Sequence, residues 1–338
     1  MCNIAGYSGN QQAAPILLEM LRKQQPYDGD MSTGVATIHG GRLYSKKIVG
    51  DVDTFLREFD LSELPGTIGI AHTRPAGDKN MPAVHPNYDP NFTMAIVTNG
   101  TSATKYRDEW SKAAVMLNEN GYDYPIPDND PSKVTNSPKL RIWLVDYYMK
   151  QGYSITKALA KSCDLVYSDN VSVIINQNYP DSIFALRTTR PMNVILENGE
   201  AYMATTRYGF PEELQNEPIM LPLFNVCVVT KDGIQITTDK MEMEPVSEMT
   251  PYTYKEAYKR FEALLMSDRA PMYFDDLEYA VGGEMRDLWP GDHTCIQHAR
   301  LVYDMLWLFD QEGRLKREMR VQNHRHGQRH RWYFWLDK

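Results

Sequence analysis

Three pairs of short apolar segments in the middle of the chain restrict the fold more than any other feature. Two of these pairs are joined by tight-turn residues, Glu197-Asn198-Gly199-Glu200 and Lys231-Asp232-Gly233. Asn-Gly and Asp-Gly between apolar segments are typical of hairpin loops, whose strands pair antiparallel. The pairs are residues 171–176 with 183–187, 192–196 with 201–205, and 226–230 with 234–238. Antiparallel sheets are therefore expected.

The first half of the chain alternates strands with helices. Apolar residues at helical spacing predict helices, whereas short β-branched segments bounded by Gly or Pro predict strands. The predicted strands are 3–7, 33–38, 67–72 and 93–98, and the predicted helices are 11–25, 105–120, 138–151 and 154–162. Together with the hairpins, this order predicts an α+β fold in which helices cover antiparallel sheets.

A change of pattern near residues 241–251, where acidic residues and prolines gather, predicts a boundary between two domains, 1–244 and 245–338. The second part is expected to be a mostly helical extension with helices at 254–266 and 298–309. Its aromatic end, residues 331–336, is expected to be a strand or a docked tail.

The net charge of −8 argues against a general nucleic-acid-binding protein. Residues 314–338 nevertheless hold eight Lys/Arg against two Asp/Glu, and three of the eight His. This tail could bind a metal, an anion or RNA, but a solvated segment or one docked on the acidic body fits its irregular spacing better. No metal, cofactor or nucleic-acid partner is predicted.

The chain has no apolar stretch long enough for a transmembrane helix and no visible signal peptide, so a cytoplasmic location without a membrane partner is expected. Its four cysteines, in 338 residues, include no C-x-x-C pair. Cys163 and Cys227 fall in predicted elements and are expected to be core residues, and Cys295 near His298 suggests no ligand site.

Cys2 differs because removal of Met1 would make it the first residue. An α-amine titrates near about 7.7–8.0, so part of it is neutral at cellular pH and can accept the thiol proton. A terminal cysteine then carries its own base, which is one way of activating a nucleophile. Alternatively, Cys2 could be only a small residue that packs at the start of a strand.

Two further segments supply groups that amide hydrolysis needs. Arg74 ends a predicted strand, and an Arg there can bind a carboxylate through two parallel N–H bonds. Asn99 and Gly100 end another, and an amide with a following backbone N–H can donate to a tetrahedral oxyanion. Taken singly, an Asn-Gly is usually a turn and an exposed Arg usually solvated.

In this order the segments resemble the class II glutamine amidotransferases, which use an N-terminal nucleophile, and most closely their glutaminase domains. The resemblance covers about residues 1–240 and is carried by residues 1–7, 27–36, 69–74, 83–86 and 97–101. It implies an α+β fold, a four-layer αββα sandwich of antiparallel sheets.

By position, the resemblance also implies roles. Cys2 would be the nucleophile, and Asn99 and Gly100 would form the oxyanion hole. Arg74 would hold the α-carboxylate of glutamine, with Thr73 beside it in the substrate site. A thioester at Cys2 would release ammonia, and water would then release glutamate. His72 and His85 are matched positions with an expected structural role.

Three departures from the family pattern affect the substrate. Asn3 stands where Gly is usual, and Pro75-Ala76-Gly77-Asp78 replaces a stretch that helps to cover the substrate. The acid that should bind the glutamine α-amine falls either on Asp130 or on Asn136. An Asn there would lose a charged contact of about 1.5–3 kcal/mol, so another amide could be the true substrate.

The remaining residues are too few for the sugar-phosphate isomerase module of the amino-sugar synthases, and no phosphate-binding Gly loop is present. The leading hypothesis is a stand-alone amidohydrolase acting on glutamine or a related amide. One alternative is a glutaminase subunit whose ammonia acceptor is a separate protein, docked on residues 245–338. The other is a non-catalytic sensor or scaffold. A homo-oligomer is left open.

Overall fold

The sequence-predicted hairpins lie within two antiparallel sheets. The structure is a computed structural model of the 338-residue chain and describes residues 1–75, 81–101, 107–243, 246, 248–289, 296–324 and 327–338. The first sheet has seven strands in the order β11-β9-β10-β1-β4-β2-β3. Their bounds are β1 Asn3–Ser8, β2 Ser32–His39, β3 Arg42–Ile48, β4 Ile68–Arg74, β9 Asn193–Glu197, β10 Glu200–Ala204 and β11 Ile219–Met220.

The second sheet has six strands in the order β13-β12-β8-β7-β6-β5, again antiparallel throughout. Its members are β5 Asn87–Tyr88, β6 Met94–Thr101, β7 Asp169–Asn176, β8 Ile183–Arg187, β12 Asn225–Thr230 and β13 Gly233–Lys240. Apolar side chains from the two sheets, such as Ile4 and Val173, share one buried cluster. The sheets therefore face each other across a common core.

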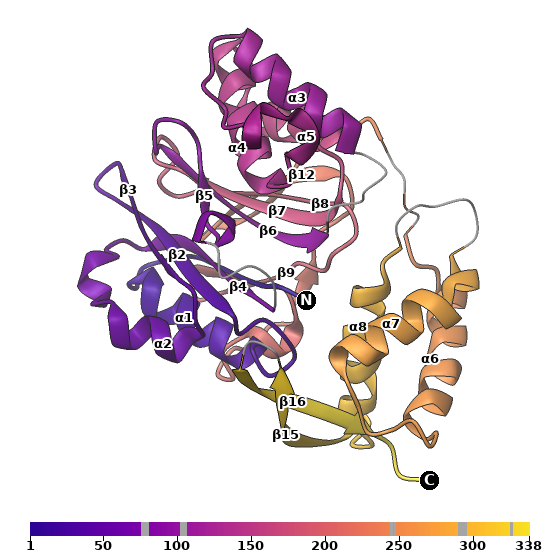
Figure 1. Cartoon of the computed structure of the whole chain (residues 1–338). Coiled ribbons are helices and arrows are strands. Elements are labelled where there is room, and N and C mark those ends of the chain that lie inside the picture. Colours follow the sequence, from indigo (N-terminus) through magenta and orange to yellow (C-terminus); the bar gives the residue numbers. More distant parts are fainter. Residues whose placement is uncertain (76–80, 102–106, 244–245, 247, 290–295, 325–326) are drawn as a thin grey trace.

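Helices cover the outer face of each sheet, which completes four layers (Figure 1). On the first sheet lie α1 Ala13–Gln24 and α2 Val52–Glu58, and on the second lie α4 Ser137–Lys150 and α5 Ile155–Leu165. Helix α3 Arg107–Glu119 packs against α4 and α5 on the side away from the sheet. Six short 3-10 turns are described at Leu61–Glu63, Met81–Ala83, Pro127–Asn129, Pro131–Lys133, Arg207–Gly209 and Arg286–Leu288. The αββα sandwich expected from the resemblance is confirmed.

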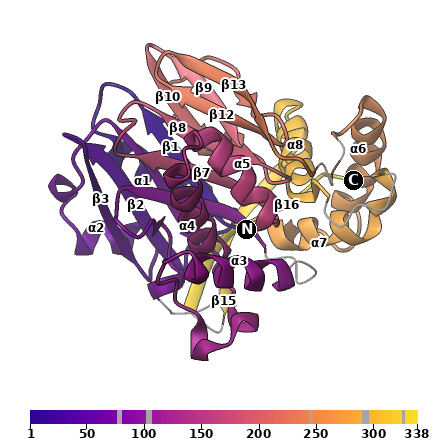
Figure 2. The same ribbon diagram turned by 90° about the horizontal axis from the view of Figure 1, so that it is seen from above.

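The C-terminal extension packs beside the sandwich, where the views of Figures 1 and 2 both place it. It contains α6 Pro251–Leu265, α7 Phe274–Glu284, α8 His298–Gln311, and a sheet of β14 Met272–Tyr273, β15 Lys316–His324 and β16 Gly327–Trp335. Its apolar cluster also takes in Met1 and Tyr27. The boundary predicted at 244/245 lies outside the described residues, and the division into two domains stays a prediction.

The aromatic end of the chain is a strand, β16, and the basic tail is partly docked on the acidic body. Trp332 N–H donates to the Pro26 carbonyl at 2.9 Å. The Arg331 guanidinium is buried against Asp28 and Asp30, at 3.2 and 2.8 Å. Because β16 and residues 26–30 are distant in sequence, the N-terminal and C-terminal parts hold each other in place.

Apart from the two-residue strands β5, β11 and β14, four strands and helices were not expected from the sequence. β3 carries the charged sequence Arg-Leu-Tyr-Ser-Lys-Lys-Ile and lies at a sheet edge, where apolar alternation is not required. α7 contains Gly282 and Gly283, which weaken a helical pattern. β15 is polar and largely exposed, and α2 has only seven residues.

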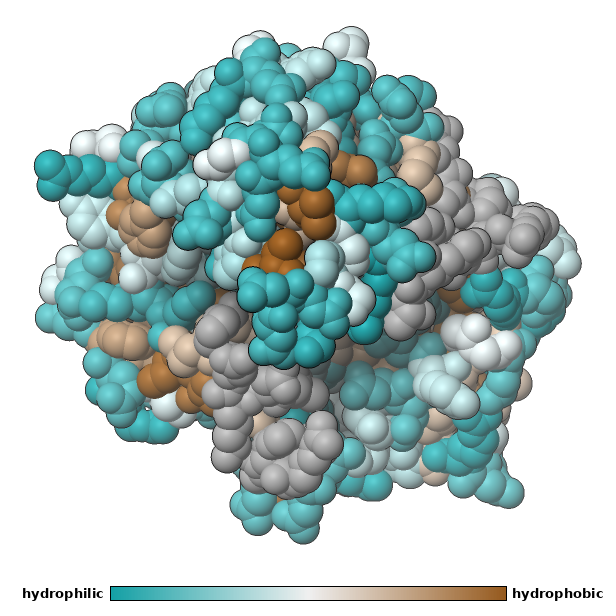
Figure 3. Space-filling view, turned by 45° about the horizontal axis from the view of Figure 1, so that its top comes forward, coloured by the Kyte–Doolittle hydropathy of each residue, from teal (hydrophilic) through white to brown (hydrophobic). Residues whose placement is uncertain are grey.

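The surface in Figure 3 is mostly hydrophilic, with hydrophobic residues confined to small areas of that face. Across the ranges that the structure describes, no helix is long and apolar enough to span a membrane.

Candidate active site

Strand β1 places Cys2 next to Arg74. Asn3 lies opposite Thr73 in the antiparallel pairing of β1 with β4. In such a register the preceding residue of one strand faces the following residue of the other, so Cys2 lies level with Arg74. Both side chains line a cavity of about 480 Å³. Two residues 72 positions apart are thus brought together by strand register.

Asn136, Gly100, His72 and His85 line the same cavity. Cys2 and Gly100 also border a second cavity of about 310 Å³, together with Asn99. The second cavity lies toward the extension, since Tyr273, Glu278 and Gln322 form part of its wall. Cys2 therefore stands between two cavities, one inside the sandwich and one at its junction with the extension.

Asn99 and Gly100 come from the end of β6. The Asn99 side chain is buried, and its Nδ2 donor has no hydrogen-bond partner among the described residues. A buried, unpaired amide donor costs free energy unless a ligand accepts from it. At Gly100 a Cβ would lie 1.9 Å from the Asp169 carbonyl oxygen, so only Gly fits. These features suit donors directed at an oxyanion.

The Cys2 thiol is half-buried. Burial raises the pKa of this thiol, whereas the N-terminal ammonium, Arg74 and Arg190 oppose that rise. The other described cysteines, Cys163 and Cys227, are buried core residues, and burial raises the pKa of Cys227 to about 11. Cys295 lies outside the described residues. Among the described cysteines, Cys2 alone has cationic groups beside an accessible cavity.

His72 and His85 form a stacked pair, with ring centroids 4.2 Å apart. The Thr98 N–H donates to His85 Nδ1 at 3.0 Å, and His72 Nε2 donates to the Thr98 carbonyl at 3.1 Å. Burial and Arg74 lower the pKa of His72 to about 3, and burial and His72 lower the pKa of His85 well below its usual value. Both are neutral near pH 7 and position the β6 backbone that leads to Asn99.

The two candidates for the amine-binding place are separated by the structure. Asn136 lies in the cavity, where its Oδ1 caps α4 by accepting from Lys139 N–H at 3.1 Å and its Nδ2 donates to Asn87. Asp130 lines neither cavity and is partly exposed, and its carboxylate accepts from Ser132 N–H instead. Thr73 is fully buried behind the cavity wall, with Oγ1 accepting from Asn3 at 3.3 Å.

Met1 lines part of the second cavity. Its ammonium pairs with Asp28 and lies 3.5 Å from Asp275. Arg190 pairs with Asp169 and Glu278, both largely buried. Although burial alone would raise the pKa of Glu278, Arg190 and His298 hold it below its usual range. The sequence carried no signal for the Arg190–Glu278 pair, because 88 residues separate its members.

Residues 76–80 lie outside the described residues, so the unusual stretch at 75–78 is described only at Pro75, which borders the second cavity.

The chain is similar in sequence to known proteins. The glutamine–fructose-6-phosphate aminotransferase (isomerizing) of Caldanaerobacter subterraneus is 30% identical over 237 residues, 70% of this chain and 36% of that protein. The enzyme of the same name from Zymomonas mobilis is 29% identical over 252 residues, 73% of this chain and 38% of its own length. The chain is a relative of the class II glutamine amidotransferases. No family model matches it.

Solved structures support the same fold. The glutamine phosphoribosylpyrophosphate amidotransferase of B. subtilis superposes with a TM-score of 0.57 at 15% identity, covering 72% of this chain and 50% of that one. A structure described as the allosteric regulatory enzyme of purine biosynthesis gives 0.60 at 14%, covering 94% and 66%. The chain spans little more than a third of the curated amidotransferases it matches.

Proposed function

We propose that this chain is an amidohydrolase of the class II glutamine amidotransferase type, which cleaves glutamine or a related amide through a thioester at Cys2. The proposal depends on one observation. The Cys2 thiol borders two cavities, and Arg74 lines one of them while the unpaired amide of Asn99 lines the other. The names of the curated relatives support glutamine as the substrate class.

The proposed reaction begins when Met1 is removed and the α-amine of Cys2 becomes free. The amine takes the thiol proton, and the sulfur attacks the amide carbon. The resulting oxyanion accepts hydrogen bonds from Asn99 Nδ2 and the Gly100 N–H. The tetrahedral intermediate then collapses. Ammonia leaves with the proton from the α-ammonium, and the acyl group stays on sulfur as a thioester.

Water completes the cycle. The α-amine removes a proton from a water molecule, which attacks the thioester carbon, and the carboxylic acid leaves as the thiol reforms. Arg74 would orient the substrate through its α-carboxylate, because its guanidinium lines the cavity that Cys2 opens into. Asn136 would receive the α-amine by hydrogen bonding without a charge, so glutamine would bind more weakly than in a site with a carboxylate there.

The test is ammonia release from glutamine by protein whose intact mass shows that Met1 is absent. Cys2→Ala is expected to abolish release. Asn99→Ala is expected to lower kcat by about 100- to 1000-fold, as loss of one oxyanion donor does elsewhere. The matched control is Cys163→Ala, which removes a buried thiol outside both cavities. If processed protein with intact Cys2 releases nothing from glutamine or a panel of other amides, the proposal is wrong.

A glutaminase subunit acting with a separate acceptor enzyme is the second candidate, because the described part of the extension carries a strand with exposed apolar side chains. The exposed strand β15, with Met319 and Val321 on its surface, would be part of the docking face. Co-purification of an acceptor enzyme that is lost in Met319→Lys would support it. A cytoplasmic location, where such enzymes obtain glutamine, is part of the same proposal.

A further inference from the structure

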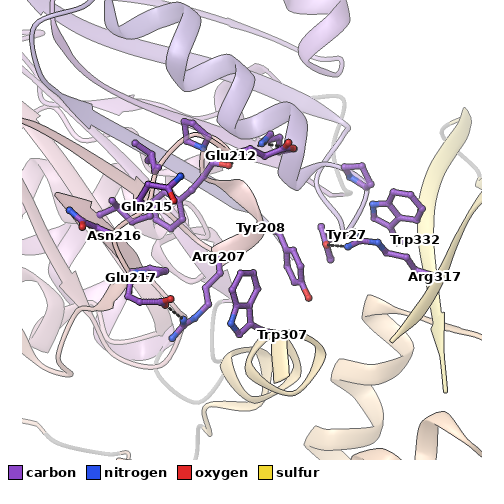
Figure 4. A pocket seen from close by; sticks show the side chains of 17 residues that line it. Tyr27, Arg207, Tyr208, Glu212, Gln215, Asn216, Glu217, Trp307, Arg317 and Trp332 are labelled. Atoms are coloured by element: carbon purple, nitrogen blue, oxygen red, sulfur yellow. Dashed lines mark hydrogen bonds and ion pairs between the residues drawn. The ribbon is translucent and has the colours of Figure 1, made fainter. Parts of the chain in front are cut away.

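A cleft of about 510 Å³ lies between the sandwich and the extension, away from Cys2. Figure 4 shows side chains converging on it from both parts of the chain. Tyr208 and Arg207 come from the turn that follows β10, and Trp307 projects from α8. Arg317 and Trp332 reach in from the β15–β16 hairpin. The volume falls in the usual range of small-molecule sites.

Aromatic rings form much of the wall. Tyr27 stacks on Tyr208 with centroids 4.9 Å apart and an interplanar angle of 20°. Trp307 meets Tyr208 edge to face at 5.3 Å. Tyr208, Trp307 and Trp332 are each only partly buried, so ring surface remains exposed to the cleft. Such a set of rings suits a flat, unsaturated ligand better than a saturated one.

Guanidinium groups lie over these rings. Arg207 is 5.6 Å from the Trp307 ring, and Arg317 is 5.9 Å from Tyr208 and 5.4 Å from Trp332. The hairpin register explains the last contact: Met319 faces Trp332, and alternate strand residues share a face, so Arg317 is a diagonal neighbour of Trp332. The rings hold the cations toward the cleft in a fixed geometry.

The charges in the cleft favour an anion. Lys23 pairs with Glu212 at 3.1 Å and Arg207 with Glu217 at 3.3 Å, and both carboxylates are highly exposed. The carboxylate nearest to Arg317 is that of Asp310, at 3.8 Å, beyond hydrogen-bond distance. Arg317 is thus weakly neutralised beside a ring platform. A cationic ligand would face three basic side chains.

From these contacts we propose that the cleft binds a small anion that carries a flat aromatic ring, of the nucleoside monophosphate class. The ring stacks on Trp307 and meets Tyr208 edge to face, and the anionic group accepts hydrogen bonds from Arg317 and Arg207. Both halves of the ligand are needed, because stacking on the rings and hydrogen bonding to the guanidiniums each supply only part of the binding free energy. The site is separate from Cys2, and its occupancy does not depend on the proposed hydrolysis.

Binding is tested by titrating the full-length protein with AMP, GMP, CMP and UMP, following tryptophan fluorescence and heat. At least one nucleotide is expected to saturate at millimolar concentration or below. Trp307→Leu is expected to weaken it by about tenfold or more, within the range of base stacking on one side chain. Arg317→Gln is expected to weaken it similarly, as for a charge-assisted hydrogen bond, whereas Arg317→Lys keeps part of the affinity.

The matched control is Arg260→Gln, which removes an exposed guanidinium of α6 outside the cleft and should leave affinity unchanged. The nucleoside of the tightest-binding nucleotide and ribose 5-phosphate, each carrying half of the ligand, should bind at least about tenfold more weakly than that nucleotide. Absence of saturable binding by all four nucleotides would overturn the proposal. So would binding that persists in both Trp307→Leu and Arg317→Gln, or equal affinity for ribose 5-phosphate.

Discussion

Replacing Arg331 by Met should destabilise the whole chain, because this side chain joins the C-terminal hairpin to the loop beside Cys2. The guanidinium binds both oxygens of Asp30, at 2.8 and 2.9 Å, and Asp28 at 3.2 Å. The side chains of Arg331 and Asp28 are each only 2% exposed. Removal leaves the buried carboxylate of Asp28 and the largely buried one of Asp30 with fewer positive partners. Breaking a buried pair costs about 3–5 kcal/mol.

The assay is urea denaturation followed by circular dichroism. If the slope is about 3 kcal/mol per molar urea, the midpoint should fall by roughly 1 M or more. The control is Arg260→Met, which breaks a two-oxygen contact with Asp287 of the same geometry, 2.7 Å for each bond, at a surface where the side chains are 37% and 61% exposed. An exposed pair of this kind is worth about 0–1 kcal/mol.

A double variant distinguishes the loss of the attraction between Arg331 and its carboxylates from the cost of leaving a carboxylate without a positive partner. Adding Asp30→Asn to Arg331→Met removes one of the uncompensated carboxylates, so the double variant should be more stable than Arg331→Met alone. The reasoning fails if Arg331→Met lowers stability no more than Arg260→Met does. It also fails if Asp30→Asn brings no recovery in the Arg331→Met background.

Two further outcomes follow from the site. The pKa of His72 is lowered to about 3 in the folded chain, so between pH 6.5 and 3 the unfolded chain binds a proton at His72 that the folded chain does not bind. His72 therefore lowers the free energy of unfolding as pH falls from about 6.5 toward 3. His72→Gln should flatten that dependence by about 1.4 kcal/mol per pH unit in urea titrations, and an unchanged slope would show that His72 is protonated in the folded chain. Asn136→Asp keeps a good cap for α4 and adds a charge opposite the substrate ammonium, so the KM for glutamine should fall by about tenfold or more. The KM for an amide that lacks an α-amine should stay the same, and a parallel fall for both substrates would refute this role of Asn136.

The sequence was sufficient for the elements with clear periodicity or turn residues. Asn198-Gly199 predicted the β9–β10 hairpin, and the apolar spacing of residues 11–25 predicted α1. Such signals are local, since each depends on the backbone preferences of a few neighbouring residues. β3 and α7 were missed because charged residues and glycines obscure their pattern, and only packing on neighbouring elements makes them regular.

For the candidate site, the sequence indicated Cys2 from its place directly after Met1, and Arg74, Asn99 and Gly100 from their places at strand ends. It left both Asp130 and Asn136 as candidates, because the short turns before α4 make the spacing ambiguous. The two are distinguished only by the structure, in which Asn136 lines the cavity and Asp130 does not. The grouping of these residues depends on strand register, which is a long-range property.

What the sequence by itself determined is therefore the set of local elements and the kinds of group available for chemistry. The tertiary structure decided which of those groups meet. It also decided that Arg331 of the basic tail binds the loop beside Cys2. In the same way it decided that Tyr208, Trp307 and Arg317 line the cleft between the sandwich and the extension. The physical reason is that buried ion pairs and ring contacts join residues up to 303 positions apart, and no local preference specifies such partners.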